Sequence, residues 1–289
     1  MKKKIISVIV GVVGLAAAYF VVSGISHIVY NRPVDNAATE STAETTEQGT
    51  EEAKAAMTED EINAMLAGMK ATETAETATE EQSEVIPVKF EELQAVNPDI
   101  YAWITVPGTV IDYPILQHAS DNTYYLMHNI DGSYGYPGCV YTENMNSKDF
   151  TDNNTVIYGH NMKNGSMFAQ LHKFEDPDFF NENREVLIYL PDEVLHYTIF
   201  AAHIYDDRHL LYSFDFTDPE VYQKYLDSIF STRDMSANID KDVTVTADDQ
   251  IITLVTCIGS QPNNRLLVQA VLTDREPGAE AAQSAEATE

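Results

Sequence analysis

Basic residues and cysteines are scarce in this chain of 289 residues. It carries 17 Lys and Arg against 46 Asp and Glu, which gives a formal net charge of -29. Proteins that follow nucleic acid backbones use Lys and Arg to displace counterions from the phosphates, so this charge argues against a nucleic acid partner. The two cysteines cannot form a disulfide framework. The fold must therefore be held together by packing, and the thiols need another explanation.

Metal-ligand spacings and internal repeats are absent from the sequence as well. It contains no HExxH or CxxC pattern, the spacings that bring His or Cys ligands to a zinc ion. We therefore expect no metal and no cofactor. The length fits one or two folded units with tails.

Charge is divided unevenly along the chain, and its basic end predicts a membrane anchor. Residues 1–34 hold four bases and no acid, and an uncharged, mostly apolar stretch from Ile5 to Tyr30 follows Lys2–Lys4. This stretch is long enough to cross a hydrocarbon core of about 30 Å as a helix. The positive-inside rule then places the N-terminus in the cytoplasm and everything after Arg32 outside a single-pass cell membrane anchor. The alternative is a cleavable signal peptide ending near Ala16–Ala18, although the apolar run continues beyond these alanines.

Residues 35–84 and 274–289 have the composition of disordered segments. The first holds fourteen acids against two lysines and few large apolar residues, which cannot bury enough surface to offset the entropy of ordering. We predict an acidic disordered linker and an acidic disordered tail. Within the linker, Thr58–Glu61 forms a capping box before Ile62, Met65, Leu66 and Met69, which recur at helical spacing. We interpret this stretch as a transient helix in the linker.

Residues 85–273 hold nearly all the aromatic side chains and predict one mostly β domain. Short β-rich runs alternate with Pro-Gly, Asp-Gly and Asn-rich turns, which favours a barrel or a sandwich. The runs are Tyr101–Val106, Val110–Leu116, Gly138–Tyr141, Thr155–Tyr158, Val186–Leu190, Val194–Ile204, Asp242–Val245, Ile251–Thr256 and Leu266–Leu272. Helices are expected at Phe90–Val96, Met167–Phe174 and Pro219–Thr232.

Cys257 has the setting of a nucleophile. It ends a strand-like run and precedes a Gly- and Asn-rich turn, after which Arg265 begins the next run. A hairpin would bring Arg265 close to Cys257, where a guanidinium can stabilise an oxyanion in acyl transfer. A thiol of ordinary pKa, about 8.5, is only slightly ionised at neutral pH and needs a basic or cationic neighbour. Arg265 could equally be an ordinary arginine at a strand edge.

His160 is the candidate acid/base. It follows the run Thr155–Gly159 and precedes a polar turn, so that its side chain can face a cleft at the end of a strand. The other seven histidines lack a comparable setting. Cys139 lies inside a β-like run and is most simply a small buried side chain, with a Cys139–Cys257 disulfide as the alternative.

Several of these stretches resemble the signature motifs of the sortases, the cysteine transpeptidases that attach proteins to the cell wall of Gram-positive bacteria. The run Thr253–Cys257 (TLVTC), the Arg265–Val268 run and Tyr158–His160 match the family's Cys, Arg and His motifs. The stretches Asn154–Phe168 and Trp103–Pro114 are similar to class B sortases in particular. The resemblance extends from about Phe90 to Leu272.

The resemblance implies an eight-stranded β-barrel with N-terminal helices and a helix between late strands, a position that Pro219–Thr232 fits. It implies that Cys257 is the nucleophile, His160 the acid/base and Arg265 the group that stabilises the oxyanion. Asn122, Leu126 and Thr256 are candidate substrate contacts. Val255 stands where class B enzymes usually have Ser, which leaves the sorting motif open.

The implied reaction cleaves a C-terminal sorting signal after Thr through a thioacyl-enzyme and joins the secreted protein to an amine of a peptidoglycan precursor. A pilin-polymerising class C-like sortase is an alternative. A cell-wall cysteine peptidase is another, although papain-like families place Cys before His and here His160 precedes Cys257. A tethered, non-catalytic adhesion barrel is the third.

Overall fold

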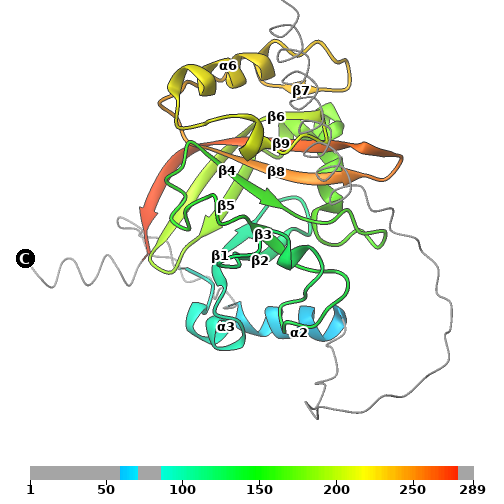
Figure 1. Ribbon diagram of the computed structural model, residues 1–289, viewed down its shortest axis with the longest axis vertical. Coiled ribbons are helices and arrows are strands. Elements are labelled where there is room, and N and C mark those ends of the chain that lie inside the picture. Colours follow the sequence, from blue (N-terminus) through cyan, green and yellow to red (C-terminus); the bar gives the residue numbers. More distant parts are fainter. Residues whose placement is uncertain (1–58, 71–85, 279–289) are drawn as a thin grey trace, which may run out of the picture. The chain divides into compact units, whose positions relative to one another are not determined.

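The structure is a computed structural model that describes residues 59–70 and 86–278. Strands dominate it, with helices before them and between them (Figure 1). In chain order the elements are α2 (Glu59–Met69), α3 (Phe90–Val96), β1 (Ile100–Thr105), β2 (Asp112–Leu116), the 3-10 helix η1 (Tyr124–Leu126), β3 (Val140–Thr142), β4 (Asn154–Tyr158), the 3-10 helix η2 (Phe168–Glu175), α4 (Pro177–Glu182), β5 (Glu185–Tyr189), β6 (Glu193–Asp206), α5 (Leu210–Ser213), α6 (Pro219–Phe230), β7 (Asn238–Ile239), β8 (Ile251–Ile258) and β9 (Gln261–Pro277).

Eight strands close into a barrel. Their order is β5-β1-β2-β3-β4-β8-β9-β6, and β6 pairs with β5 to complete the ring. The short β7 pairs with β6 and lies outside the ring. Most neighbouring strands are antiparallel, whereas the β2–β3 and β4–β8 pairs are parallel. The mostly β, eight-stranded barrel expected from the sequence is confirmed.

Apolar side chains from almost every strand fill the inside of the barrel. Ile104, Ile115, Ile157, Leu254 and Val268 belong to one buried cluster, and each is at most 1% exposed. Burial of this many apolar side chains explains how the domain holds together without a disulfide between its two free cysteines. The strands thus form a rigid frame from which loops can present reactive side chains.

Helix α6 lies between the sixth and seventh strands of the barrel, as the sequence predicts. Asp218 caps it by accepting hydrogen bonds from the amides of Glu220 and Val221, and Pro219 occupies its first turn. Tyr222 and Leu226 on its inner face are completely buried against the outside of the sheet. The helix ends at Phe230, two residues earlier than predicted.

Two stretches differ from the sequence prediction in their secondary structure. Asp242–Val245 is not a strand, and the short β7 forms just before it. Val245 is nevertheless buried in the cluster beneath α6, so the alternating pattern reflected burial of a loop rather than strand pairing. The helix expected at Met167–Phe174 is present as the 3-10 helix η2, displaced by one residue.

Helix α2 is the main addition to what the sequence predicts. The capping box does mark a helix, but this helix packs on the domain instead of lying free in the linker. Ile62 and Leu66 are buried, and the Lys70 ammonium lies 2.7 Å from the Asp112 carboxylate. Asp112 also accepts hydrogen bonds from the Trp103 indole and the Thr105 hydroxyl, both at 2.8 Å. Asp112, whose carboxylate holds Lys70 at the end of α2, therefore lies in the stretch Trp103–Pro114 that resembles class B sortases.

The ordered domain also continues past the expected boundary at residue 273. Strand β9 runs to Pro277, and Arg275 pairs with Glu193 at 2.9 Å and donates to the Phe150 carbonyl. The anchor predicted at 1–34, most of the linker and the end of the tail lie outside the described residues. Within the residues that are described, no helix has the length and apolar character needed to cross a membrane.

Candidate active site

The parallel pairing of β4 with β8 brings His160 and Cys257 to the same edge of the barrel. Tyr158 pairs with Val255, and the Gly159 amide donates to the Val255 carbonyl at 3.1 Å. His160 follows β4 directly, and Cys257 lies near the end of β8. Because both strands run in the same direction, the two predicted reactive residues lie at neighbouring strand ends.

Thr256 ties these two strand ends together. Its side chain is 1% exposed, and its hydroxyl donates to the Gly159 carbonyl at 2.9 Å. The sequence suggested Thr256 as a substrate contact. The structure instead turns its side chain inward, because residues of a strand point alternately to opposite faces and Cys257 points outward.

Cys257 is an exposed free thiol that lies directly across from Arg265 in the β8–β9 hairpin. In the ligand-free structure the Arg265 Nη1 donates to the carbonyls of Pro262 and Asn264, each at 2.8 Å. The hairpin thus places one guanidinium beside the thiol and holds it by its own backbone. This is the juxtaposition that the sequence predicted.

His160 is held by the loop that contains Leu126. Its Nε2 lies 2.7 Å from the Leu126 carbonyl oxygen, so this nitrogen carries the proton and donates it. Burial lowers the pKa of His160 below its ordinary value of 6.5, and the hydrogen bond to Leu126 partly opposes that shift. At neutral pH the ring is therefore uncharged, and Nδ1 is its basic nitrogen.

Two other predicted residues lie on the loop around η1. Leu126 is 40% exposed, while its backbone contacts His160 as described. Asn122 uses its side-chain oxygen to accept a hydrogen bond from the Asn144 amide at 2.9 Å. A Cβ added at Gly138, whose φ is +68°, would lie 2.7 Å from the Tyr125 carbonyl oxygen and 2.9 Å from that of Leu126. Glycine is therefore needed here to let the chain pass close behind the loop.

Cys139 is buried and unpaired with Cys257, since both cysteines are free thiols. Burial raises the pKa of the Cys139 thiol strongly. Its sulfur lies 3.4 Å from the His128 carbonyl. The expectation of a small buried side chain is met, and the alternative of a disulfide is not.

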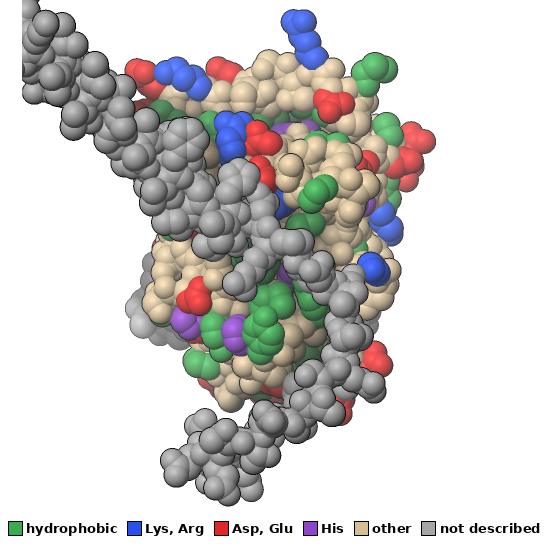
Figure 2. Space-filling view, turned by 45° about the vertical axis from the view of Figure 1, so that its right-hand side comes forward, with side chains coloured by type: hydrophobic (Ala, Val, Ile, Leu, Met, Phe, Trp, Pro, Cys, Tyr) green, Lys and Arg blue, Asp and Glu red, His purple; other side chains and the backbone are tan. Residues whose placement is uncertain are grey.

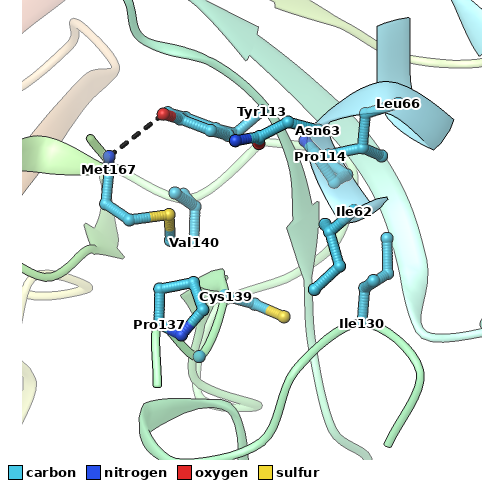
Figure 3. A pocket seen from close by; sticks show the side chains of 11 residues that line it. Ile62, Asn63, Leu66, Tyr113, Pro114, Ile130, Pro137, Cys139, Val140 and Met167 are labelled. Carbon is cyan, nitrogen blue, oxygen red and sulfur yellow. Dashed lines mark hydrogen bonds between the residues drawn. The ribbon is translucent and has the colours of Figure 1, made fainter. Parts of the chain in front are cut away.

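A small apolar pocket lies between α2 and the segments that carry Tyr113, Pro137–Val140 and Met167 (Figure 3). Ile62 and Leu66 line it from α2, and Pro137 and Cys139 line it from the loop. On the far side, the Met167 amide donates to the Tyr113 hydroxyl at 3.0 Å, which fixes the start of η2. Helix α2 thus lies across the pocket from Gly138, the residue that packs behind the Leu126 carbonyl.

Sequence analysis missed three residues of the site. Asn161 and His172 both direct side-chain nitrogens at the carbonyl oxygen of Cys257, at 2.8 and 3.1 Å, and Glu175 accepts from His172. The spacing of His172 and Glu175 is three residues on one helix, a pattern that brings side chains together. The sequence spacing therefore predicts the contact between His172 and Glu175. No pattern near these two residues points to Cys257, which lies 85 residues further along the chain.

Basic side chains do not gather into a patch on the face of the domain that Figure 2 shows. On the face in Figure 2, the side chains of Lys and Arg lie apart from one another among acidic ones. Among residues 59–70 and 86–278, no three His, Cys, Asp or Glu side chains cluster in a way that could hold a metal ion.

Comparison with known proteins agrees with this fold and this arrangement. A family model described as the sortase domain matches residues 104–273. Sortase B of Listeria monocytogenes is 33% identical over 215 residues, which cover 73% of this chain and 85% of the relative.

Solved structures give the same result. The crystal structure of sortase B from Bacillus anthracis in complex with AAEK2 superposes with a TM-score of 0.61 at 31% identity, covering 76% of this chain and 99% of that one. A Staphylococcus aureus sortase B–substrate complex gives a TM-score of 0.56 at 27% identity, covering 64% and 84%. A barrel with Cys, His and Arg at one edge defines a sortase-type enzyme. The chain belongs to the sortase family, and within it to class B.

Proposed function

We propose that this sortase cleaves a C-terminal sorting signal after Thr and transfers the new acyl end to an amine of the cell wall. The observation that carries the proposal is the position of Cys257, an exposed thiol paired across the hairpin with Arg265 and next to the strand end that bears His160. Acyl transfer needs a nucleophile, an oxyanion stabiliser and a proton donor, and these three side chains supply one each.

In the first step the Cys257 thiol gives its proton to Nδ1 of the uncharged His160 ring, and its sulfur bonds to the carbonyl carbon of the Thr. Arg265 donates to the oxygen that becomes negative, and for this its N–H groups turn from the hairpin carbonyls toward the substrate. The C–N bond then breaks, the leaving amine takes a proton from His160, and a thioester with Cys257 remains.

In the second step an amine attacks the thioester. A new C–N bond forms, the C–S bond breaks, and Cys257 leaves as a thiolate while His160 receives the proton of the amine. His160 then returns this proton to the thiolate, which restores the starting state. The overall exchange of one amide for another requires no cofactor, since atoms and charges balance with the three side chains alone.

The partners follow from this chemistry and from the predicted anchor. The donor is a secreted protein with a C-terminal sorting motif, and the acceptor is the amine of a peptidoglycan precursor. An anchor at 1–34 would hold the catalytic domain at the outer membrane face, where both substrates pass. The Staphylococcus aureus relative crystallised as a substrate complex supports a site of this kind.

The nucleophile is tested with two cysteine variants of the full-length chain. A peptide library with a variable residue on either side of Thr first identifies a cleaved sequence. With that peptide, Cys257→Ala should abolish both cleavage and the thioester adduct seen by mass spectrometry. The matched control Cys139→Ala should keep both, because that thiol is buried. Cleavage by Cys257→Ala would refute the mechanism.

The acceptor is tested separately by mass spectrometry of the joined product in cells. A cell-wall peptide attached to the Thr is the expected result. A lysine side chain of a pilin in its place would instead indicate a class C-like polymerase. This comparison also bears on Val255, whose apolar side chain stands where class B sortases usually have Ser.

A further inference from the structure

The backbone carbonyl of Cys257 is held by two side chains from the segment after β4. The Asn161 side-chain nitrogen lies 2.8 Å from this oxygen, and the His172 Nε2 lies 3.1 Å from it. The same two nitrogens are 3.0 Å apart. Three polar groups therefore meet directly behind the nucleophile.

Regular strand pairing ends at this point of the structure. In the β4–β8 ladder the Gly159 amide donates to Val255, so the next donor in register would be the amide of residue 161, facing Cys257. The chain turns instead, and Asn161 forms a bridge with Met167. On the other side, the β8–β9 register shifts between Cys257 and Ile258. Side-chain contacts from Asn161 and His172 therefore take the place of the backbone hydrogen bonds that would otherwise hold Cys257.

Glu175 orients the histidine in this group. Its carboxylate lies 2.8 Å from the His172 Nδ1, and both residues lie on η2, where side chains three residues apart eclipse each other. A carboxylate accepts, so Nδ1 carries a proton and Nε2 faces Asn161 and Cys257.

In both charge states of the ring, a hydrogen-bond donor remains for the Cys257 carbonyl. In the neutral ring, Nε2 accepts one hydrogen of the Asn161 amide, which leaves the second hydrogen for the Cys257 carbonyl. In the protonated ring, Nε2 donates to that carbonyl directly. Either way, a chain of contacts runs from Glu175 through His172 to the backbone of Cys257.

We propose that Glu175, His172 and Asn161 form a relay that fixes the position of Cys257 for attack. They are positioning residues, because they touch the carbonyl of Cys257 and not its sulfur or the substrate. The inference rests on the proposed function, in which Cys257 is the nucleophile. Misplacement of a reacting group by about 1 Å can cost about 100-fold in rate, so loss of the relay should lower kcat while leaving KM nearly unchanged.

The experiment compares variants that remove or keep the hydrogen bonds. His172→Phe keeps a ring but has no donor, whereas His172→Gln keeps an amide that can donate. Glu175→Ala removes the acceptor, whereas Glu175→Gln keeps one in its side-chain oxygen. The matched control is Glu185→Gln, because Glu185 faces His196 at 3.7 Å on β5, in another His–Glu pair.

Rates are measured with the full-length protein and the peptide from the library screen. Labelling of the buried Cys139 with iodoacetamide, read by mass spectrometry of its peptide, measures the unfolded fraction, so that kcat can be referred to folded enzyme. We expect kcat to fall by about 10-fold to 100-fold in His172→Phe and Glu175→Ala, with KM changed less than about 2-fold. His172→Gln and Glu175→Gln should recover most of the loss, and Glu185→Gln should match the wild type.

The inference is overturned if Glu175→Ala keeps the wild-type kcat, or if Glu175→Gln is as impaired as Glu175→Ala. The Glu175 side chain is 39% exposed, so we expect its variants to fold. They therefore test the inference even if His172→Phe does not fold. A Cys257→Ala variant that stays active refutes the proposed function. An inactive Cys257→Ala together with unimpaired relay variants refutes this inference alone.

Discussion

Gly159→Ala tests how tightly the strand end before His160 is packed. An added Cβ would lie 2.5 Å from Cγ of the Phe168 ring and 2.7 Å from its Cδ2. Phe168 is completely buried, so its ring has no room to move away. Overpacking of this kind costs about 1–3 kcal/mol of unfolding free energy.

The clash should affect catalysis as well as stability. The Phe168 amide donates to the His160 carbonyl at 2.9 Å, so a displaced Phe168 pulls on the residue that we propose as acid/base. A shift of about 1 Å in His160 would lower kcat by about 100-fold. Gly159→Ala is therefore expected to lower kcat by more than a loss of about 1–3 kcal/mol of unfolding free energy, the cost of overpacking, would account for.

Urea unfolding followed by circular dichroism gives the stability, and peptide cleavage gives kcat. Phe168→Leu alone should cost about 1–3 kcal/mol because it leaves a cavity. Combined with Gly159→Ala it should cost less than the sum of the two, because the smaller side chain makes room for the new methyl group. Gly68→Ala is the control, since a Cβ there meets nothing within 4 Å and alanine favours a helix. Wild-type stability and kcat in Gly159→Ala, or additive losses in the double variant, would refute the reasoning.

Three further predictions concern the surroundings of the site. Gly138→Ala should lower kcat by about 10-fold, measured by peptide cleavage, since its Cβ would displace the Leu126 carbonyl that holds His160. Asp112→Ala should cost about 2–3 kcal/mol in urea unfolding because buried donors lose their acceptor, whereas Lys70→Met should cost less than about 1 kcal/mol. Burial lowers the folded-state pKa of His203, so stability should be fully present above about pH 6.5 and fall as pH decreases below it. The slope should be at most about 1.4 kcal/mol per pH unit, and His203→Gln should flatten it in unfolding curves between about pH 5 and 7.

The sequence predicts the parts of this fold that depend on local patterns. Alternating apolar runs mark most barrel strands, and the Asp218–Pro219 start signal marks α6 because capping is a local interaction. The positions of His160 and Cys257 at strand ends are also local, since the turn residues that follow each strand are visible in the sequence.

Other features depend on contacts between distant residues and could not be read in this way. The Thr256 hydroxyl donates to the carbonyl of Gly159, which lies 97 residues away, so this partner is not visible in the local sequence. Helix α2 shows its amphipathic pattern in the sequence, but the surface that receives it is formed by residues such as Tyr125 and Trp103, far along the chain. The contact of His172 with Cys257 likewise exists only once η2 is laid against β8.

The parallel pairing of β4 with β8 also has a consequence for folding kinetics. It joins segments nearly 100 residues apart, and the loop between them must close before any contact across the pair can form. Such non-local pairings form slowly, and β8 is among the last strands in the chain. The thiol of Cys257 therefore meets its proposed partner His160 only when the barrel is nearly complete. A chain that is truncated or still folding has a cysteine but no acyl-transfer site, so the fold itself delays reactivity until the domain is assembled.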